Sequence, residues 1–228
     1  MIPESRNKTV ALALVSALAA SALGYWGYSA HQKRELHKAV VALVTDTSAR
    51  LRDALNIEAG LPPADPAATV RKLDEHAAAV DRNLTEIKRM DASRNLALAD
   101  ATDSYLLTVR EILRYQASSH WFRLGLSEST QALRDHMRAD DRSGSWVREA
   151  VRAKEQVNTD YRDYRLASGA FRTLLESFPA DQAKIAPYVG ASPLIDQNLV
   201  GTARERALEV SKQAAGEMEK IKQLDAYR

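Results

Sequence analysis

The chain has 228 residues, with 32 lysines and arginines against 30 aspartates and glutamates, and its formal net charge is +2. This near balance does not favour a polyanionic partner, so we expect the chain to bind no nucleic acid. The sequence contains no cysteine, which excludes disulfide bonds, thiolate metal sites and a cysteine nucleophile. Few glycines and prolines and abundant alanine predict an all-α protein built from long helices.

Residues 1–8 form a short N-terminal tail, and an uncharged segment, TVALALVSALAASALGYWGYSA, follows at residues 9–30. About 20 helical residues cross the hydrocarbon core of a bilayer. The segment therefore predicts a single transmembrane signal-anchor helix, and the helical pattern continues from it into the rest of the chain without a break.

Aromatic residues mark the C-terminal end of this segment. Tyr25, Trp26 and Tyr28 have the amphipathic rings that favour the membrane–water interface. Lys33 and Arg34 follow directly, which predicts that the chain enters water at this point. We expect these five residues to lie at the membrane interface.

Two features of the anchor leave alternatives open. Residues 20–22, Ala-Ser-Ala, offer a small-x-small cleavage site, so a cleaved signal peptide is the alternative to an anchor. Basic residues stand on both sides of the segment, so the positive-inside rule is nearly balanced. The balance leans slightly towards a cytoplasmic C-terminal domain, which is the alternative orientation. Because long domains translocate largely regardless of charge, we expect a bacterial inner-membrane protein with residues 31–228 in the periplasm.

Residues 31–228 predict one domain of about five long helices. Turn signals separate these helices at LPPADP (61–66), at DAS (91–93), at DDRSGS (140–145) and in a longer connection from FPADQ to Pro193, which has room for one short helix. Asp91 or Ser93 is the expected N-cap of the third helix, and Ser145 that of the fourth. Short turns place successive helices antiparallel, which predicts an elongated bundle.

Apolar residues recur at steps of three and four, as in the seam of a coiled coil. In the second helix they are Val70, Leu73, Ala77, Val80, Leu84 and Ile87. In the fourth helix they include Val147, Val157, Tyr161, Tyr164, Phe171 and Phe178. This spacing predicts coiled-coil-like packing between the helices.

The most unusual internal stretch is SSHWFRL at 118–124, within the third predicted helix. Trp121 offers an aromatic surface, His120 a group that titrates near neutral pH, and Arg123 a cation for an anionic ligand. One hypothesis is therefore a ligand pocket between helices. The alternative is that Phe122 packs inside while the polar side chains face water.

Three further aromatic residues are candidates for ligand or partner contact. Tyr161 and Tyr164 fall on the predicted seam, where they line a pocket or act as core residues with a hydroxyl at the edge. Trp146 stands at the third–fourth turn, where an exposed indole is a contact anchor or the cap of the bundle end. The surrounding arginines alternate with acidic residues, which is typical of a solvated face.

No catalytic or cofactor motif is found. The sequence has no glycine-rich phosphate loop, no G-x-S-x-G elbow, and no H-x-x-x-H or E-x-x-H ligand pair. We therefore expect no enzyme activity, no metal and no cofactor.

An anchor followed by a long antiparallel bundle is similar to the architecture of bacterial helical sensor ectodomains. Such receptors usually return through a second membrane helix, and the sequence has no second apolar span. We therefore expect a membrane-anchored interaction or scaffold subunit that binds the bilayer and a protein partner or a second copy of itself. The alternative is a sensor-like bundle that binds a ligand and modulates a separate membrane protein.

Overall fold

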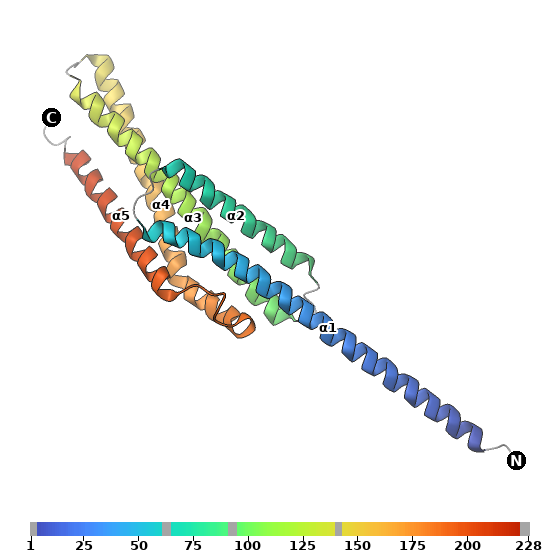
Figure 1. The fold of residues 1–228 in the computed structure, drawn as a ribbon. Helices are drawn as coiled ribbons and strands as arrows, with labels where there is room; N and C mark the ends of the chain where they lie inside the picture. The colour runs from blue at the N-terminus through green and yellow to red at the C-terminus, as the bar shows by residue number, and fades with distance from the viewer. Residues whose placement is uncertain (1–3, 61–64, 91–94, 140–142, 224–228) are drawn as a thin grey trace.

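A computed structural model describes residues 4–60, 65–90, 95–139 and 143–223, with side chains from residue 30 onward. The described residues form five helices: α1 (Glu4–Ala59), α2 (Pro66–Arg89), α3 (Leu96–Arg138), α4 (Gly144–Val189) and α5 (Gln197–Gln223). Successive helices reverse direction, as Figure 1 shows. The predicted all-α antiparallel bundle is therefore confirmed.

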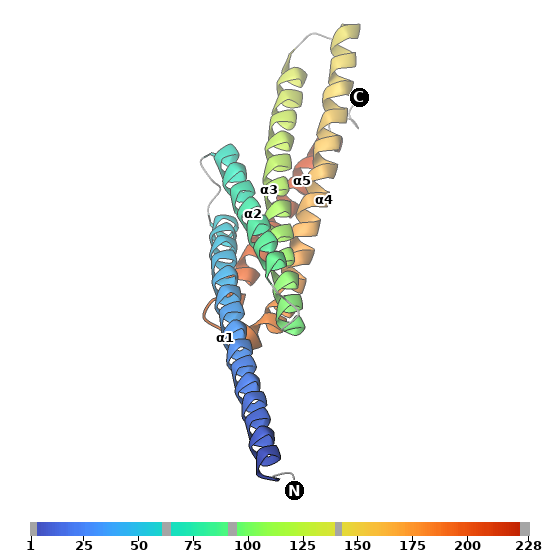
Figure 2. The same cartoon turned by 90° about the vertical axis from the view of Figure 1, so that its right-hand side faces the viewer.

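The molecule is elongated because its helices are unequal and staggered. α1 protrudes at the N-terminal end, while the α3–α4 hairpin extends past the ends of α1 and α2 at the other end (Figure 2). α3 contains 43 residues. At a rise of 1.5 Å per residue it is about 65 Å long.

α1 is one uninterrupted helix of 56 residues, so the predicted anchor segment and the first bundle helix belong to the same element. Apart from its last residue, the segment 9–30 lies outside the residues whose side chains are described, as do Tyr25, Trp26 and Tyr28. Among the described residues, no helix combines the length and the apolar character that crossing a membrane requires.

The buried side chains form two cores along the rod. The proximal core, nearer the N-terminus, is shared by all five helices. Its largest fully buried members are Leu51, Leu55, Leu73, Leu98, Tyr105, Leu106, Ile112, Leu113, Phe171, Leu175 and Phe178. The distal core is formed by α3, α4 and α5, and consists of Leu126, Leu133, Val157, Tyr164, Val210, Met218 and Ile221. The boundary between the cores lies near the end of α1.

The predicted seams agree with burial along most of the chain. In α2, Leu73, Ala77, Val80, Leu84 and Ile87 are buried and Val70 is partly buried. The seam of α4 fails at its first position, because Val147 is 49% exposed while Trp146 is buried. The reason is local: the indole of Trp146 stacks on the imidazole of His136 at the end of the hairpin.

α3 and α4 begin at residues other than those predicted. Asn95, rather than Asp91 or Ser93, caps α3, and Ser143, rather than Ser145, caps α4. In both cases the side-chain oxygen accepts a hydrogen bond from the backbone N–H three residues later. Several adjacent residues can serve as caps, so composition alone does not select the one that is used.

The predicted connection from FPADQ to Pro193 was wrong over most of its length. α4 continues through Pro179 and Pro187 and ends only at Gly190, which has a φ of 75°. Both prolines lie on the exposed side of the helix. Each proline removes one helical hydrogen bond, and Phe178 and Ile185, which are fully buried, hold the helix together.

Candidate functional site

The SSHWFRL stretch lies in the middle of α3, beside the end of α1 and the start of α2 (Figure 1). A helix turns by about 100° per residue, so these adjacent side chains cannot share one pocket. Ser118, Trp121 and Phe122 face α2, and His120 and Arg123 face the other side of α3. The structure therefore separates residues that the pocket hypothesis had grouped.

His120 and Arg123 belong to a polar group, which we call the junction cluster, with Glu58, Tyr164 and Ser168. His120 Nε2 lies 3.0 Å from Glu58 Oε2, and the two side chains are only 9% and 11% exposed. The cavity inside the cluster is about 10 Å³, close to the smallest volume that holds one water molecule. The cluster therefore ties the last turn of α1 to α3 and leaves no room for an organic ligand.

The two seam tyrosines have different environments. Tyr164 is buried, and its hydroxyl lies 3.4 Å from Ser211 Oγ, which in turn donates to Ser168. Burial raises the pKa of Tyr164, although the Ser211 hydrogen bond and the charge of Arg123 oppose that shift. Tyr161 is partly buried and packs against the distal core. Both tyrosines therefore contribute to the core, and Tyr164 also closes the junction cluster.

The opposite side of α3 has an open groove, which we call the Trp121 groove. It has a volume of about 490 Å³ and lies between the first turns of α2 and the middle of α3. Ala67, Ala117 and Ser118 are small, and this leaves the space between the two helices. The indole of Trp121 is 57% exposed beside it.

Two oppositely charged side chains, Arg71 and Asp74, also line the Trp121 groove. No hydrogen bond or ion pair joins either of them to another described residue. The sequence pattern does not distinguish either residue, because each stands among other charged residues of α2. Only the packing of α2 on α3 distinguishes them from their neighbours.

Trp146 does not form the exposed anchor that was considered for it. Its side chain is 6% exposed, and its ring lies 5.0 Å from that of His136. Trp146 Nε1 donates to the backbone oxygen of His136, and His136 Nε2 lies 2.9 Å from the backbone oxygen of Trp146. These reciprocal contacts close the tip of the α3–α4 hairpin.

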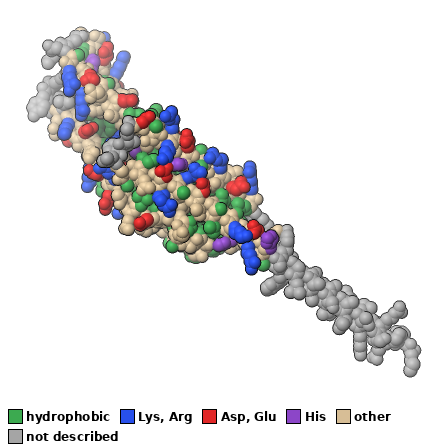
Figure 3. Space-filling view, in the orientation of Figure 1, with side chains coloured by type: hydrophobic (Ala, Val, Ile, Leu, Met, Phe, Trp, Pro, Cys, Tyr) green, Lys and Arg blue, Asp and Glu red, His purple; other side chains and the backbone are tan. Residues whose placement is uncertain are grey.

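Lys33 and Arg34 lie on the exposed part of α1 that leads into the bundle. In Figure 3 basic and histidine side chains gather where the described residues meet the grey part of α1. Elsewhere on the face drawn, basic and acidic side chains are intermixed. The neck of the molecule is therefore polar, whereas the body has no broad region of one charge on this face.

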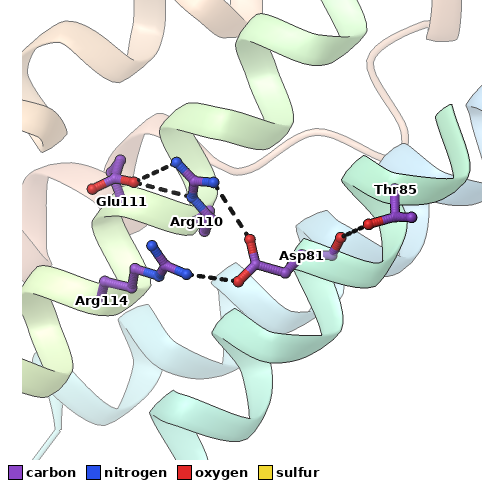
Figure 4. Close-up of polar contacts among 5 residues, drawn as sticks. All are labelled: Asp81, Thr85, Arg110, Glu111 and Arg114. Atoms are coloured by element: carbon purple, nitrogen blue, oxygen red, sulfur yellow. Dashed lines mark hydrogen bonds and ion pairs between the residues drawn. The ribbon is translucent and has the colours of Figure 1, made fainter. Parts of the chain in front are cut away.

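α2 and α3 are joined by the ion pairs of Asp81, drawn in Figure 4. Its two carboxylate oxygens lie 3.4 Å from Arg110 and 2.7 Å from Arg114. Arg110 also pairs with Glu111 on its own helix at 2.7 Å. The backbone oxygen of Asp81 accepts from Thr85. These exposed and half-exposed contacts fix the register of α2 on α3, and we assign them no chemistry.

A second interhelical carboxylate, Asp181 of α4, accepts hydrogen bonds from Ser104 and Thr108 of α3 and from Lys184. Burial alone raises the pKa of Asp181, but these three donors outweigh it and hold the pKa below its usual value. The ionised carboxylate therefore stabilises the packing of α3 against α4.

Among the described residues, no three His, Asp or Glu side chains are placed to hold one metal ion. Comparison of the chain with protein-family models, curated proteins and solved structures finds no match.

Proposed function

We propose that the chain is a non-catalytic, single-pass membrane-anchored protein of the bacterial envelope, whose helical rod presents a surface to another protein or to a second copy of itself. The continuity of α1 is the observation that carries this proposal. The same helix contains the apolar segment 9–30 and, after the polar neck, the buried residues Val40, Val44 and Leu51. An anchor of this kind holds the bundle without a flexible linker.

Exposed apolar side chains on the distal half of the rod support an interaction role. Val147 and Val151 of α4 are 49% and 52% exposed, and they lie one turn apart on the same side of the helix. Leu166, which is 68% exposed, lies farther along the same helix at the level of the junction cluster and is not part of this pair. Side chains of this type are typical of contact surfaces when they gather on one face.

Placement in the membrane is tested by protease treatment of intact spheroplasts that produce the full chain. We expect degradation of residues 31–228, because the domain lies outside the inner membrane. Complete protection until lysis would show the reverse orientation. We expect the mature protein to begin at or near Met1, whereas a mature N-terminus near Leu23 would show that the segment is a cleaved signal peptide.

Partner binding is tested by a photo-cross-linking side chain placed at Val151 in the full-length protein. We expect a discrete cross-linked species, either a dimer or a complex with one partner. The matched control places the same group at Glu176, which is exposed on the proximal part of α4. A monomer at both positions in membranes and in mild detergent would contradict the interaction role.

A second candidate is the sensor-like bundle that binds a ligand and modulates a separate membrane protein. The observation in its favour is the Trp121 groove, since a volume of about 490 Å³ falls in the range of small-molecule sites. The junction cluster does not contribute to this candidate, because its cavity is too small. If the groove is a site, it is formed by α2 and α3.

A further inference from the structure

We infer that the Trp121 groove is a binding site for a small aromatic zwitterion, of the class of free aromatic amino acids. This inference specifies the ligand of the second candidate function and does not depend on the membrane anchor. All groups that carry it lie on α2 and α3, between residues 67 and 122. Protease protection and cross-linking test the anchored rod, so either proposal can fail while the other stands.

The apolar part of the groove fits a ring. Trp121 presents a flat aromatic surface that is 57% exposed, and Phe122 and Val70 form the adjoining wall. Aromatic pairs prefer offset-stacked or edge-to-face contacts, which an exposed indole offers without any rearrangement of the core. A bound ring covers apolar surface on Trp121 that otherwise contacts water.

The charged part of the groove fits a ligand that carries both signs of charge. Arg71 and Asp74 are three residues apart on α2, so their Cβ atoms are about 5–6 Å apart and the side chains leave the helix on the same side. Their order, with the cation nearer the helix N-terminus, is the less favourable one for pairing with each other. Arg71 is suited to a carboxylate and Asp74 to an ammonium group.

This complementarity discriminates between ligand classes. A simple anion would meet Asp74, and a simple cation would meet Arg71, so each would be opposed by one of the two charges. A zwitterion satisfies both, and Ser118 adds a hydroxyl that donates or accepts at the edge of the groove. Because the groove is open to solvent and the ligand is small, we expect a dissociation constant between about 10 μM and 1 mM.

The inference is tested by isothermal titration of the full-length chain with L-phenylalanine, at one fixed concentration of mild detergent. L-leucine lacks the ring, phenethylamine lacks the carboxylate and 3-phenylpropionate lacks the ammonium group. We expect L-phenylalanine to bind at least about tenfold more tightly than any of these three, because losing a charged hydrogen-bond partner or a ring contact weakens binding by that order. The indole emission should change on binding, and Trp121→Phe should remove that change.

Variants of Arg71 and Asp74 test whether each of the two charges contributes to ligand binding. Arg71→Gln and Asp74→Asn should each weaken binding of L-phenylalanine at least about tenfold. The matched controls, Arg89→Gln and Glu75→Gln, alter exposed charges on α2 outside the groove and should bind normally. A circular dichroism melt of each variant checks that the fold is kept.

Three results would overturn the inference. The first is no detectable heat with L-phenylalanine at millimolar concentration. The second is equally tight binding of phenethylamine or 3-phenylpropionate, which would show that the two charges do not act together. The third is unchanged affinity in folded Arg71→Gln and Asp74→Asn variants, which would place the ligand elsewhere on the chain.

Discussion

Replacing Tyr105 with phenylalanine should destabilise the bundle at neutral pH but not at high pH. Tyr105 is fully buried in the proximal core, and its hydroxyl lies 2.7 Å from Ser48 Oγ, which is also buried. Burial raises the pKa of Tyr105 to about 12, although the Ser48 hydrogen bond and the charge of Arg52 act in the opposite direction. The phenol is therefore protonated in the fold at a pH where the unfolded chain ionises it.

The effect of Tyr105→Phe on the unfolding free energy has opposite signs at the two ends of the pH range. Below pH 10 both states hold the proton, and Tyr105→Phe costs only the hydrogen bond, about 1 kcal/mol. Above pH 10 the unfolded state releases the proton first, so the wild type loses about 1.4 kcal/mol of stability per pH unit until the folded-state pKa is reached. By pH 11.5 this loss is about 2 kcal/mol, larger than the cost of the lost hydrogen bond.

The measurement is guanidinium denaturation of the wild type and of Tyr105→Phe in parallel at pH 8 and pH 11.5. Other tyrosines and the lysines titrate in both proteins, so only the difference between the two unfolding free energies is compared. We expect the variant to be less stable at pH 8 and equally or more stable at pH 11.5. A difference that stays constant between the two pH values would refute the assigned burial and pKa of Tyr105.

Three further predictions concern other contacts. Ile87→Asp should lower the unfolding free energy by about 2–5 kcal/mol or more, because it removes a buried aliphatic chain and buries an unpaired carboxylate. The exposed control Glu86→Asp should change the unfolding free energy by no more than about 0.5 kcal/mol. Equal melting temperatures of the two variants would disprove the register of α2. Gln182→Ala should lower the unfolding free energy by about 2–4 kcal/mol in denaturant titration, because the Gln182 side chain bonds both the backbone N–H and the backbone oxygen of the buried Ile195 in the α4–α5 connection. The exposed control Gln213→Ala should leave the unfolding free energy unchanged. Asp181→Asn should lower the unfolding free energy of the protein at pH 7. The difference from the wild type should shrink as the pH falls below about 4, because a carboxylate with a lowered pKa stabilises the fold only above that range. A difference that does not change with pH would contradict this assignment.

The number and order of the helices could be predicted because each helix carries its own periodic pattern. In α2, the steps of three and four assign Leu73, Leu84 and Ile87 to the buried side, and the structure agrees. This information is local: it depends only on which residues of one helix share a face. The break between α1, which ends at Ala59, and α2, which begins at Pro66, was also predictable, because proline and polar residues interrupt the pattern there.

The pattern failed where a single residue type was read without its surroundings. Pro179 and Pro187 predicted the end of α4, because each costs the helix one hydrogen bond, yet both lie on the exposed side and the helix continues past them. The burial of Phe178 and Ile185 beside them outweighs that cost. Which side of a helix faces solvent at a given proline depends on the neighbouring helices, so the sequence of α4 alone did not decide the outcome.

The candidate site was less predictable than the fold because it depends on the register between helices. His120 meets Glu58, which is 62 positions away, and Trp121 meets the start of α2. A displacement of α1 or α2 by one turn along α3 would keep the seams buried and exchange all these partners. The sequence identified SSHWFRL as unusual, but it could not show that its side chains diverge to two sides of α3.

Because the helices are staggered, the two halves of the rod are built from different sets of helices. α1 ends and α2 begins near the middle of α3, so beyond that level the α3–α4 hairpin is accompanied by α5 alone among the described helices (Figures 1 and 2). The distal half therefore leaves Val147 and Val151 exposed at the end that lies farthest from the N-terminal part of α1. The Trp121 groove lies at the level where α2 begins, because the first turns of α2 form its wall against α3. The proposed ligand site therefore lies between the N-terminal part of α1, which we propose as the anchor, and the exposed valines that we propose as the contact surface.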